Sequence, residues 1–134
     1  MSPNDQQHRA DVELRLPADG AYVSVVRTTT AGLAARLDFT IDDIEDLRIA
    51  VGEACALVLP EAVPGSDLVC TFLLAPGRMT LTVTVTTAGT AAPDHDSFAW
   101  QVLETMASSA RADAHDGLLT VTLTMDSPPT DTGD

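Results

Sequence analysis

The sequence contains no lysine: its seven basic residues are all arginines, and 20 acidic residues bring the formal net charge to −13. Nucleic acid attracts basic surfaces and repels acidic ones, so it is excluded as a partner. Only two cysteines are present, Cys55 and Cys70, each inside an apolar run and without Cys-x-x-Cys spacing. We therefore expect buried thiols in a reducing compartment, with a structural disulfide as the less favoured alternative.

Long apolar runs are also missing. No stretch approaches the roughly 20 apolar residues that span a bilayer, and residues 1–9 lack the apolar core of a signal peptide. The sequence predicts a cytoplasmic protein with no membrane partner. Its 134 residues correspond to one domain. The polar ends predict flexible tails over residues 1–10 and 127–134, around a domain over residues 11–126.

Hydrophobic periodicity predicts the first half of the domain. Residues 11–16 alternate polar and apolar before Pro17, which predicts a strand. Apolar positions spaced by three and four predict a helix over residues 21–37, weakened by Gly32. Thr40 begins a capping-box-like segment, and an apolar face then continues to Pro60, which predicts a second helix.

The second half reads as strands 68–74 and 78–86 in a hairpin, a loop over 87–96, a helix from Ser97 to about Ala112, and a strand over 119–125. Phe98, Val102, Met106 and Ala110, with Leu103 beside them, are expected to form the buried stripe of that helix. Trp100 projects from another side, as a core aromatic or, alternatively, as part of a pocket or partner surface. The predicted fold class is an α/β (α+β) two-layer sandwich with helices on one face of a mainly antiparallel sheet.

A family resemblance rests on three segments. The sequence resembles the RsbW and SpoIIAB anti-sigma factors at residues 12–14, in the first predicted strand, and at residues 41–55, IDDIEDLRIAVGEAC. Residues 97–103, SFAWQVL, are similar to the degenerate actinobacterial UsfX and UshX branch of that family. The resemblance implies a histidine-kinase-like ATPase fold, a homodimer, sequestration of a sigma factor, and relief by an anti-anti-sigma factor antagonist.

The sequence departs from that family at its nucleotide site. Active members carry a glutamate, matched by Glu53, and four residues later a magnesium-binding asparagine, where this chain has Leu57. The family's aspartate-glycine motif is missing from residues 86–90, and the segment replacing the glycine-rich lid contains Asp94 and Asp96. We therefore expect weak or absent binding of ATP and magnesium, no cofactor, and no enzymatic activity.

The resemblance also suggests a binding surface. Arg27 matches an arginine with which the family contacts sigma factor and antagonist, and Val23 and Ser24 are assigned to the same surface. Glu53, Leu57, Asp94, Asp96 and Trp100 are assigned to a vestigial nucleotide or effector pocket. The acid and histidine runs at 94–96 and 113–116 lack the spacing of helical metal ligands, so no metal site is predicted.

Three functions remain open at this point. The favoured one is an anti-sigma factor that acts by protein binding with a degenerate nucleotide site. The first alternative is a serine kinase of an anti-anti-sigma factor. The second is a regulator that senses a neutral small molecule such as a sugar, with Trp100 as the apolar face and acids as hydrogen-bond acceptors.

Overall fold

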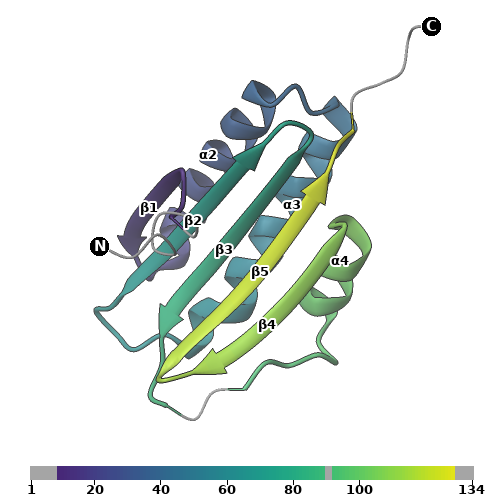
Figure 1. Cartoon of the computed structure of the whole chain (residues 1–134). Helices are drawn as coiled ribbons and strands as arrows, with labels where there is room; N and C mark the ends of the chain where they lie inside the picture. Colours follow the sequence, from purple (N-terminus) through teal and green to yellow (C-terminus); the bar gives the residue numbers. More distant parts are fainter. Residues whose placement is uncertain (1–8, 90–91, 129–134) are drawn as a thin grey trace, which may run out of the picture.

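The computed structural model describes residues 9–89 and 92–128, which form one antiparallel sheet with helices on a single face (Figure 1). The strands are β1 (Val12–Pro17), β2 (Asp67–Ala75), β3 (Arg78–Thr86), β4 (Ser109–His115) and β5 (Leu118–Asp126). The helices are α2 (Val23–Arg36), α3 (Ile41–Val58) and α4 (Phe98–Met106), with short 3-10 turns η1 (Gly20–Tyr22) and η2 (Leu59–Glu61). The strand order is β1-β2-β3-β5-β4, and the predicted two-layer α+β sandwich is confirmed.

Helix α3 lies centrally under the sheet, and its start follows from local sequence. The Thr40 hydroxyl accepts a hydrogen bond from the Asp43 backbone N–H at 3.1 Å, as an N-cap does. Asp42 and Asp43 in the first turn favour the positive end of the helix dipole. The buried face of the helix comprises Leu47, Ala50, Val51, Gly52, Ala54, Cys55 and Val58.

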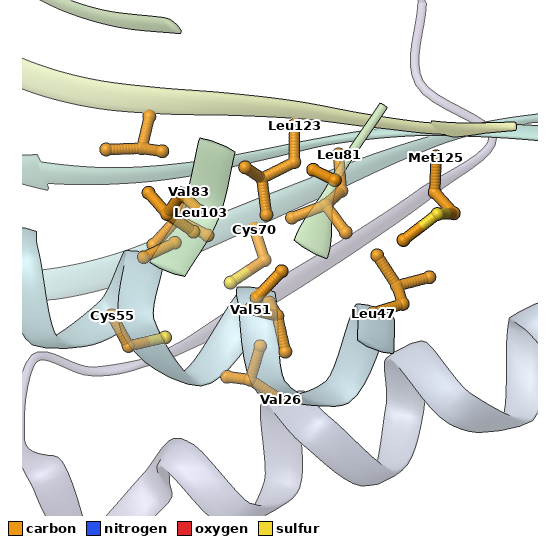
Figure 2. Close-up of a cluster of buried hydrophobic side chains, with 14 of the residues drawn as sticks. Val26, Leu47, Val51, Cys55, Cys70, Leu81, Val83, Leu103, Leu123 and Met125 are labelled. Carbon is orange, nitrogen blue, oxygen red and sulfur yellow. The ribbon is translucent and has the colours of Figure 1, made fainter. Parts of the chain in front are cut away.

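The core lies between the sheet and the helices (Figure 2). Alternate residues of β3 and β5 point inward, so Leu81, Val83 and Leu123 meet Val51 of α3 and Leu103 of α4. The opposite face carries threonines in cross-strand pairs, such as Thr84 with Thr120 at 2.9 Å between hydroxyl oxygens. No helix covers this threonine face within the described residues.

The third predicted helix is too long. Helix α4 ends at Met106, and residues 109–115 form strand β4, which pairs with β5 from Ser109↔Thr124 to His115↔Leu118. The turn between them is Asp116–Gly117, both with positive φ (54° and 76°), the geometry of a tight hairpin. The spacing of apolar residues that extends the predicted helix to Ala112 is also compatible with a strand. The segment forms a strand because its residues pair with β5.

The buried face of α4 also differs from the prediction. Phe98 is 76% exposed, whereas Trp100 is 5% exposed and Leu103 is fully buried. Burying Trp100 removes a larger apolar surface from water than burying Phe98, so the helix turns Trp100 inward. Val102 and Met106, which share the predicted stripe, are only half-buried.

The ordered fold extends past the predicted boundary at residue 126. Ser127 is 2% exposed, its backbone N–H donates to the Gly77 carbonyl at 2.8 Å, and its hydroxyl donates to Asp43 at 2.6 Å. Assigning Ser127 to a flexible tail was therefore wrong. Residues 1–8 and 129–134 of the predicted tails, and Thr90 and Ala91 of the predicted loop, lie outside the described residues.

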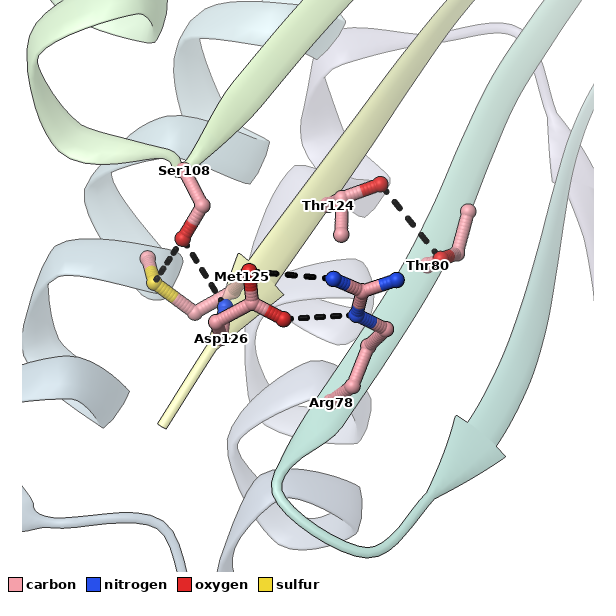
Figure 3. Close-up of polar contacts among 6 residues, drawn as sticks. All are labelled: Arg78, Thr80, Ser108, Thr124, Met125 and Asp126. Atoms are coloured by element: carbon pink, nitrogen blue, oxygen red, sulfur yellow. Dashed lines mark hydrogen bonds and ion pairs between the residues drawn. The ribbon is translucent and has the colours of Figure 1, made fainter. Parts of the chain in front are cut away.

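Polar contacts secure the same end of the sheet (Figure 3). The Arg78 guanidinium donates to Asp126 at 2.6 Å from Nε, and this exposed hydrogen bond raises the pKa of Arg78. The Ser108 hydroxyl accepts from the Asp126 backbone N–H at 2.9 Å, which joins the end of β5 to the segment after α4.

None of the helices in the described part of the chain has the length and hydrophobicity needed to span a membrane.

Candidate functional site

Arg27 lies on the flank of α2 that faces α3. Its neighbour Val26 is fully buried against the core, whereas Arg27 itself is exposed. The Arg27 guanidinium lies across Gly52 of α3: a Cβ added at position 52 would be 2.8 Å from Nε and 2.9 Å from one terminal nitrogen. Arg27 is thus exposed, but its charged end rests on the neighbouring helix.

A shallow surface groove surrounds this contact. Its lining residues are Arg27, Glu45, Arg48, Ile49 and Glu53. Arg48 pairs with Glu45 at 3.9 Å. Within residues 9–89 and 92–128, no ion pair or side-chain hydrogen bond engages Arg27 or Glu53. The groove therefore offers one guanidinium and one carboxylate, beside an isoleucine that is 44% exposed.

The other two residues assigned to this surface differ in availability. Ser24 is exposed on α2, one turn before the guanidinium of Arg27. Val23 is half-buried and packs against the hydrophobic core, so little of it is available to a partner.

The predicted pocket residues do not all come together. Leu57, Asp94 and Trp100 line a cavity of about 60 Å³, together with Glu61, Ala92, Pro93, Ala112, Leu119 and Val121. Glu53 lines the Arg27 groove instead, and Asp96 is exposed and does not line the cavity. Pockets that hold drug-sized ligands have volumes of roughly 300–1,000 Å³. The cavity is smaller than such pockets, and the sugar effector stays a prediction.

The acids before α4 organise the chain locally. The Asp94 side chain accepts from the Asp96 backbone N–H at 3.0 Å, and the Asp94 carbonyl accepts from the Ser97 hydroxyl at 2.9 Å. Ser97 caps α4 by accepting from the Trp100 backbone N–H at 3.1 Å. The His95 ring meets Trp100 edge-on with centroids 4.6 Å apart. These contacts account for Asp94 by turn and cap formation.

The two thiols are buried, as predicted, and Figure 2 shows both in the core. Burial raises the pKa of Cys55 to about 11, and the nearby positive charge of Arg27 opposes that increase. Burial, followed by the neighbouring Cys55, raises the pKa of Cys70 to about 12. Both therefore remain neutral thiols near pH 7, poor as nucleophiles and as metal ligands.

At the family's nucleotide site, Leu57 offers no oxygen ligand to magnesium, and the cavity that it lines together with Trp100 is about 60 Å³. In the part of the chain that the structure describes, no three acidic, histidine or cysteine residues are grouped to hold a metal ion. The expected weak binding of ATP and magnesium stays a prediction.

Sequence reasoning missed Gly52 and the role of its helix neighbour Ile49. A glycine inside an otherwise strong helix is the one signal that could have indicated a close approach there, because glycine costs roughly 1 kcal/mol relative to alanine in a helix interior.

Comparisons with known proteins confirm the resemblance to RsbW. The chain is 45% identical over 74 residues to Serine-protein kinase RsbW of Halalkalibacterium halodurans, covering 54% of this chain and 46% of that protein. It is 49% identical over 51 residues to Serine-protein kinase RsbW of Bacillus velezensis, covering 38% and 32%. The chain thus matches less than half the length of these curated relatives. No family model matches it.

A solved structure supports the fold assignment. The crystal structure of the RsbU and RsbW domains of Rv1364c from Mycobacterium tuberculosis matches with a TM-score of 0.65 and 21% identity, over 86% of this chain and 32% of that chain. This likeness supports the two-layer α+β fold expected from the resemblance.

These relatives correct one expectation. Leu57 and the missing aspartate-glycine motif predict a protein without enzymatic activity. That prediction is wrong as an interpretation of the family, because relatives at 45–49% identity are named serine-protein kinases and therefore point to a kinase. The likeness of the matching segments to these kinases outweighs the three local departures at the nucleotide site.

Proposed function

We propose that this chain is an RsbW-type regulator that binds a sigma factor by protein–protein contact and is relieved by an anti-anti-sigma factor. The observation that carries this proposal is Arg27, exposed on α2 and resting across Gly52 beside Glu53. Arginines held in place at a surface are enriched at the centres of protein interfaces. The likeness to RsbW supports the choice of partner.

The proposal extends to location and assembly. A protein that sequesters a sigma factor acts in the cytoplasm, where transcription takes place. A homodimer is also expected from the resemblance, and the mass of the purified chain by light scattering would test it.

The test is direct titration. Each sigma factor encoded in the source genome is purified and titrated into the chain by calorimetry. We expect one of them to bind with a Kd in the micromolar range or tighter, and the cognate anti-anti-sigma factor to displace it. If none of the sigma factors binds, the proposal is overturned.

A second candidate function is that of a serine-protein kinase, which the names of the relatives favour. With a cavity of about 60 Å³ between Leu57 and Trp100, this activity requires those side chains to move apart or the nucleotide to bind elsewhere. The assay incubates the chain with ATP, magnesium and a purified anti-anti-sigma factor, and identifies phosphoserine by mass spectrometry. A Glu53→Gln variant is the matched control, since the resemblance makes Glu53 the general base. Phosphate transfer by the native chain but not by the variant supports the kinase function. If neither protein transfers phosphate, the kinase function is rejected.

A further inference from the structure

Gly52 is an unusual residue for its position. It lies in the middle of α3 and is buried, yet glycine is one of the weakest helix formers. The atoms above it are those of the Arg27 guanidinium, at 2.8, 2.9 and 3.3 Å from the position of an added Cβ. Real Cβ contacts are longer than this, so any side chain at position 52 would displace the guanidinium.

The second glycine in the middle of a helix provides a comparison within the chain. Gly32 lies inside α2, and a Cβ added there would meet nothing within 4 Å. Helix formation alone thus gives no reason for glycine at either position, whereas the space occupied by Arg27 gives one at Gly52.

The groove around this contact has a defined chemical pattern. Glu45, Ile49 and Glu53 follow one another at intervals of four residues, so they lie along one face of α3. Glu45 is already paired with Arg48, which leaves the guanidinium of Arg27, the partly exposed Ile49 and the carboxylate of Glu53 for a partner. Opposite charges beside an apolar side chain suit a protein segment, and the acidic chain disfavours polyanions.

We propose that Gly52 positions Arg27, and that the resulting groove recognises a segment of the partner protein that presents a carboxylate to Arg27, an apolar side chain to Ile49 and a cation to Glu53. This inference rests on the proposed function for the identity of the partner, but the Gly52–Arg27 contact stands without it. Gly52 is a positioning residue, because it acts only through the side chain of Arg27.

The first arm of the test needs no partner. The Nε–Hε signal of Arg27 in ¹⁵N NMR spectra, assigned by its loss in Arg27→Ala, is compared in the native chain, Gly52→Ala and Gly32→Ala. We expect the signal to move in Gly52→Ala and to stay in place in Gly32→Ala. Both variants should melt at or above the native temperature, because alanine favours the helix. An unmoved signal in Gly52→Ala would overturn the positioning role.

The second arm measures binding of the sigma factor found by the titration above. We expect Gly52→Ala to weaken binding roughly tenfold and Gly32→Ala to change it by less than about twofold. In the Arg27→Ala variant, adding Gly52→Ala should cause no further loss of affinity. If Gly52→Ala instead weakened binding by disturbing the packing of the helices, the further loss would also be seen without Arg27. If Gly52→Ala binds with native affinity while Arg27→Ala binds more weakly, only the positioning role of Gly52 is rejected. If Arg27→Ala itself binds with native affinity, the proposed binding of the sigma factor at the Arg27 surface is rejected.

The third arm tests the cation. Glu53→Lys is compared with Glu104→Lys, which makes the same charge change at an exposed position of α4 outside the groove. We expect Glu53→Lys to weaken sigma-factor binding roughly tenfold and Glu104→Lys to change it by less than about threefold. Equal effects of the two variants would show that net charge alone matters and would overturn recognition by Glu53.

Discussion

The guanidinium of Arg27 in α2 lies directly over the Cα of Gly52 in α3, so close that a Cβ at position 52 would be 2.8 Å from Nε. This contact joins two helices at the surface by a charged group rather than by an apolar one. A guanidinium that already rests on a neighbouring helix loses less side-chain freedom when a partner binds than one in open solvent. The pair therefore prepares Arg27 for recognition.

Reversing the charge of Arg27 should separate binding from folding. We expect Arg27→Glu to weaken sigma-factor binding by about 2 kcal/mol, roughly 30-fold, because it places an unmatched charge at the centre of the interface. Its melting temperature should stay within a few degrees of the native value, since Arg27 is exposed. Titration calorimetry and thermal melting measure the two effects.

Arg36→Glu provides the matched control for that variant. Arg36 is an exposed arginine in the last turn of the same helix and does not line the groove. The net charge changes equally in both variants. Binding that falls as much in Arg36→Glu as in Arg27→Glu would mean that overall charge, not the Arg27 contact, governs affinity.

The parts of the fold that sequence predicted are those with local signals. Helix α3 has a capping threonine, first-turn acids and a terminating proline, and the β2–β3 hairpin has Pro76–Gly77 between alternating segments. Strand β4 has only a weak local pattern and exists because its residues hydrogen-bond to β5. The placement of Arg27 across Gly52 depends on how α2 packs on α3, which no single segment encodes.

Trp100, not Phe98, should carry the stability of α4. We expect Trp100→Ala to lower the free energy of unfolding by about 3 kcal/mol or more, because it leaves a cavity beside Leu57. Phe98→Ser should change it by less than about 0.5 kcal/mol, since Phe98 is 76% exposed. Urea denaturation of both variants measures the difference. A larger loss of stability in Phe98→Ser than in Trp100→Ala would contradict the buried face described here and support the buried stripe expected from sequence.

Ser127 should contribute to stability although it lies close to the end of the chain. Its hydroxyl donates to the Asp43 carboxylate and accepts from the Thr40 backbone N–H at 3.3 Å, so it ties the start of α3 to the end of β5. We expect Ser127→Ala to lower the free energy of unfolding by about 2 kcal/mol, as for a buried hydrogen bond to a charged group. Ser109→Ala, at an exposed position of β4, should have little effect. Equal stability of the two variants in urea would contradict this role.

The thiols couple stability to alkaline pH. Burial raises the pKa of Cys55 from 9.0 to about 11 and that of Cys70 from 9.0 to about 12, so the folded state holds both protons more tightly than the unfolded state does. The associated stabilisation is fully present below pH 9. It is lost as the pH rises from 9 towards 11 and 12, because the unfolded thiols then ionise first.

We therefore expect the free energy of unfolding to fall between pH 9 and pH 11, with a slope that decreases when one thiol is removed. Cys70→Ala should be less stable than the native chain near pH 8, by roughly 1 kcal/mol for the smaller core side chain. The gap should narrow by pH 11, because the variant has lost one group whose pKa differs between states. Urea denaturation at pH 8, 9, 10 and 11 measures both curves, and Tyr22 and the arginines, common to both chains, cancel in the difference. Parallel curves would mean that the Cys70 thiol ionises equally readily in the folded and unfolded states, contrary to its burial on the inner face of β2.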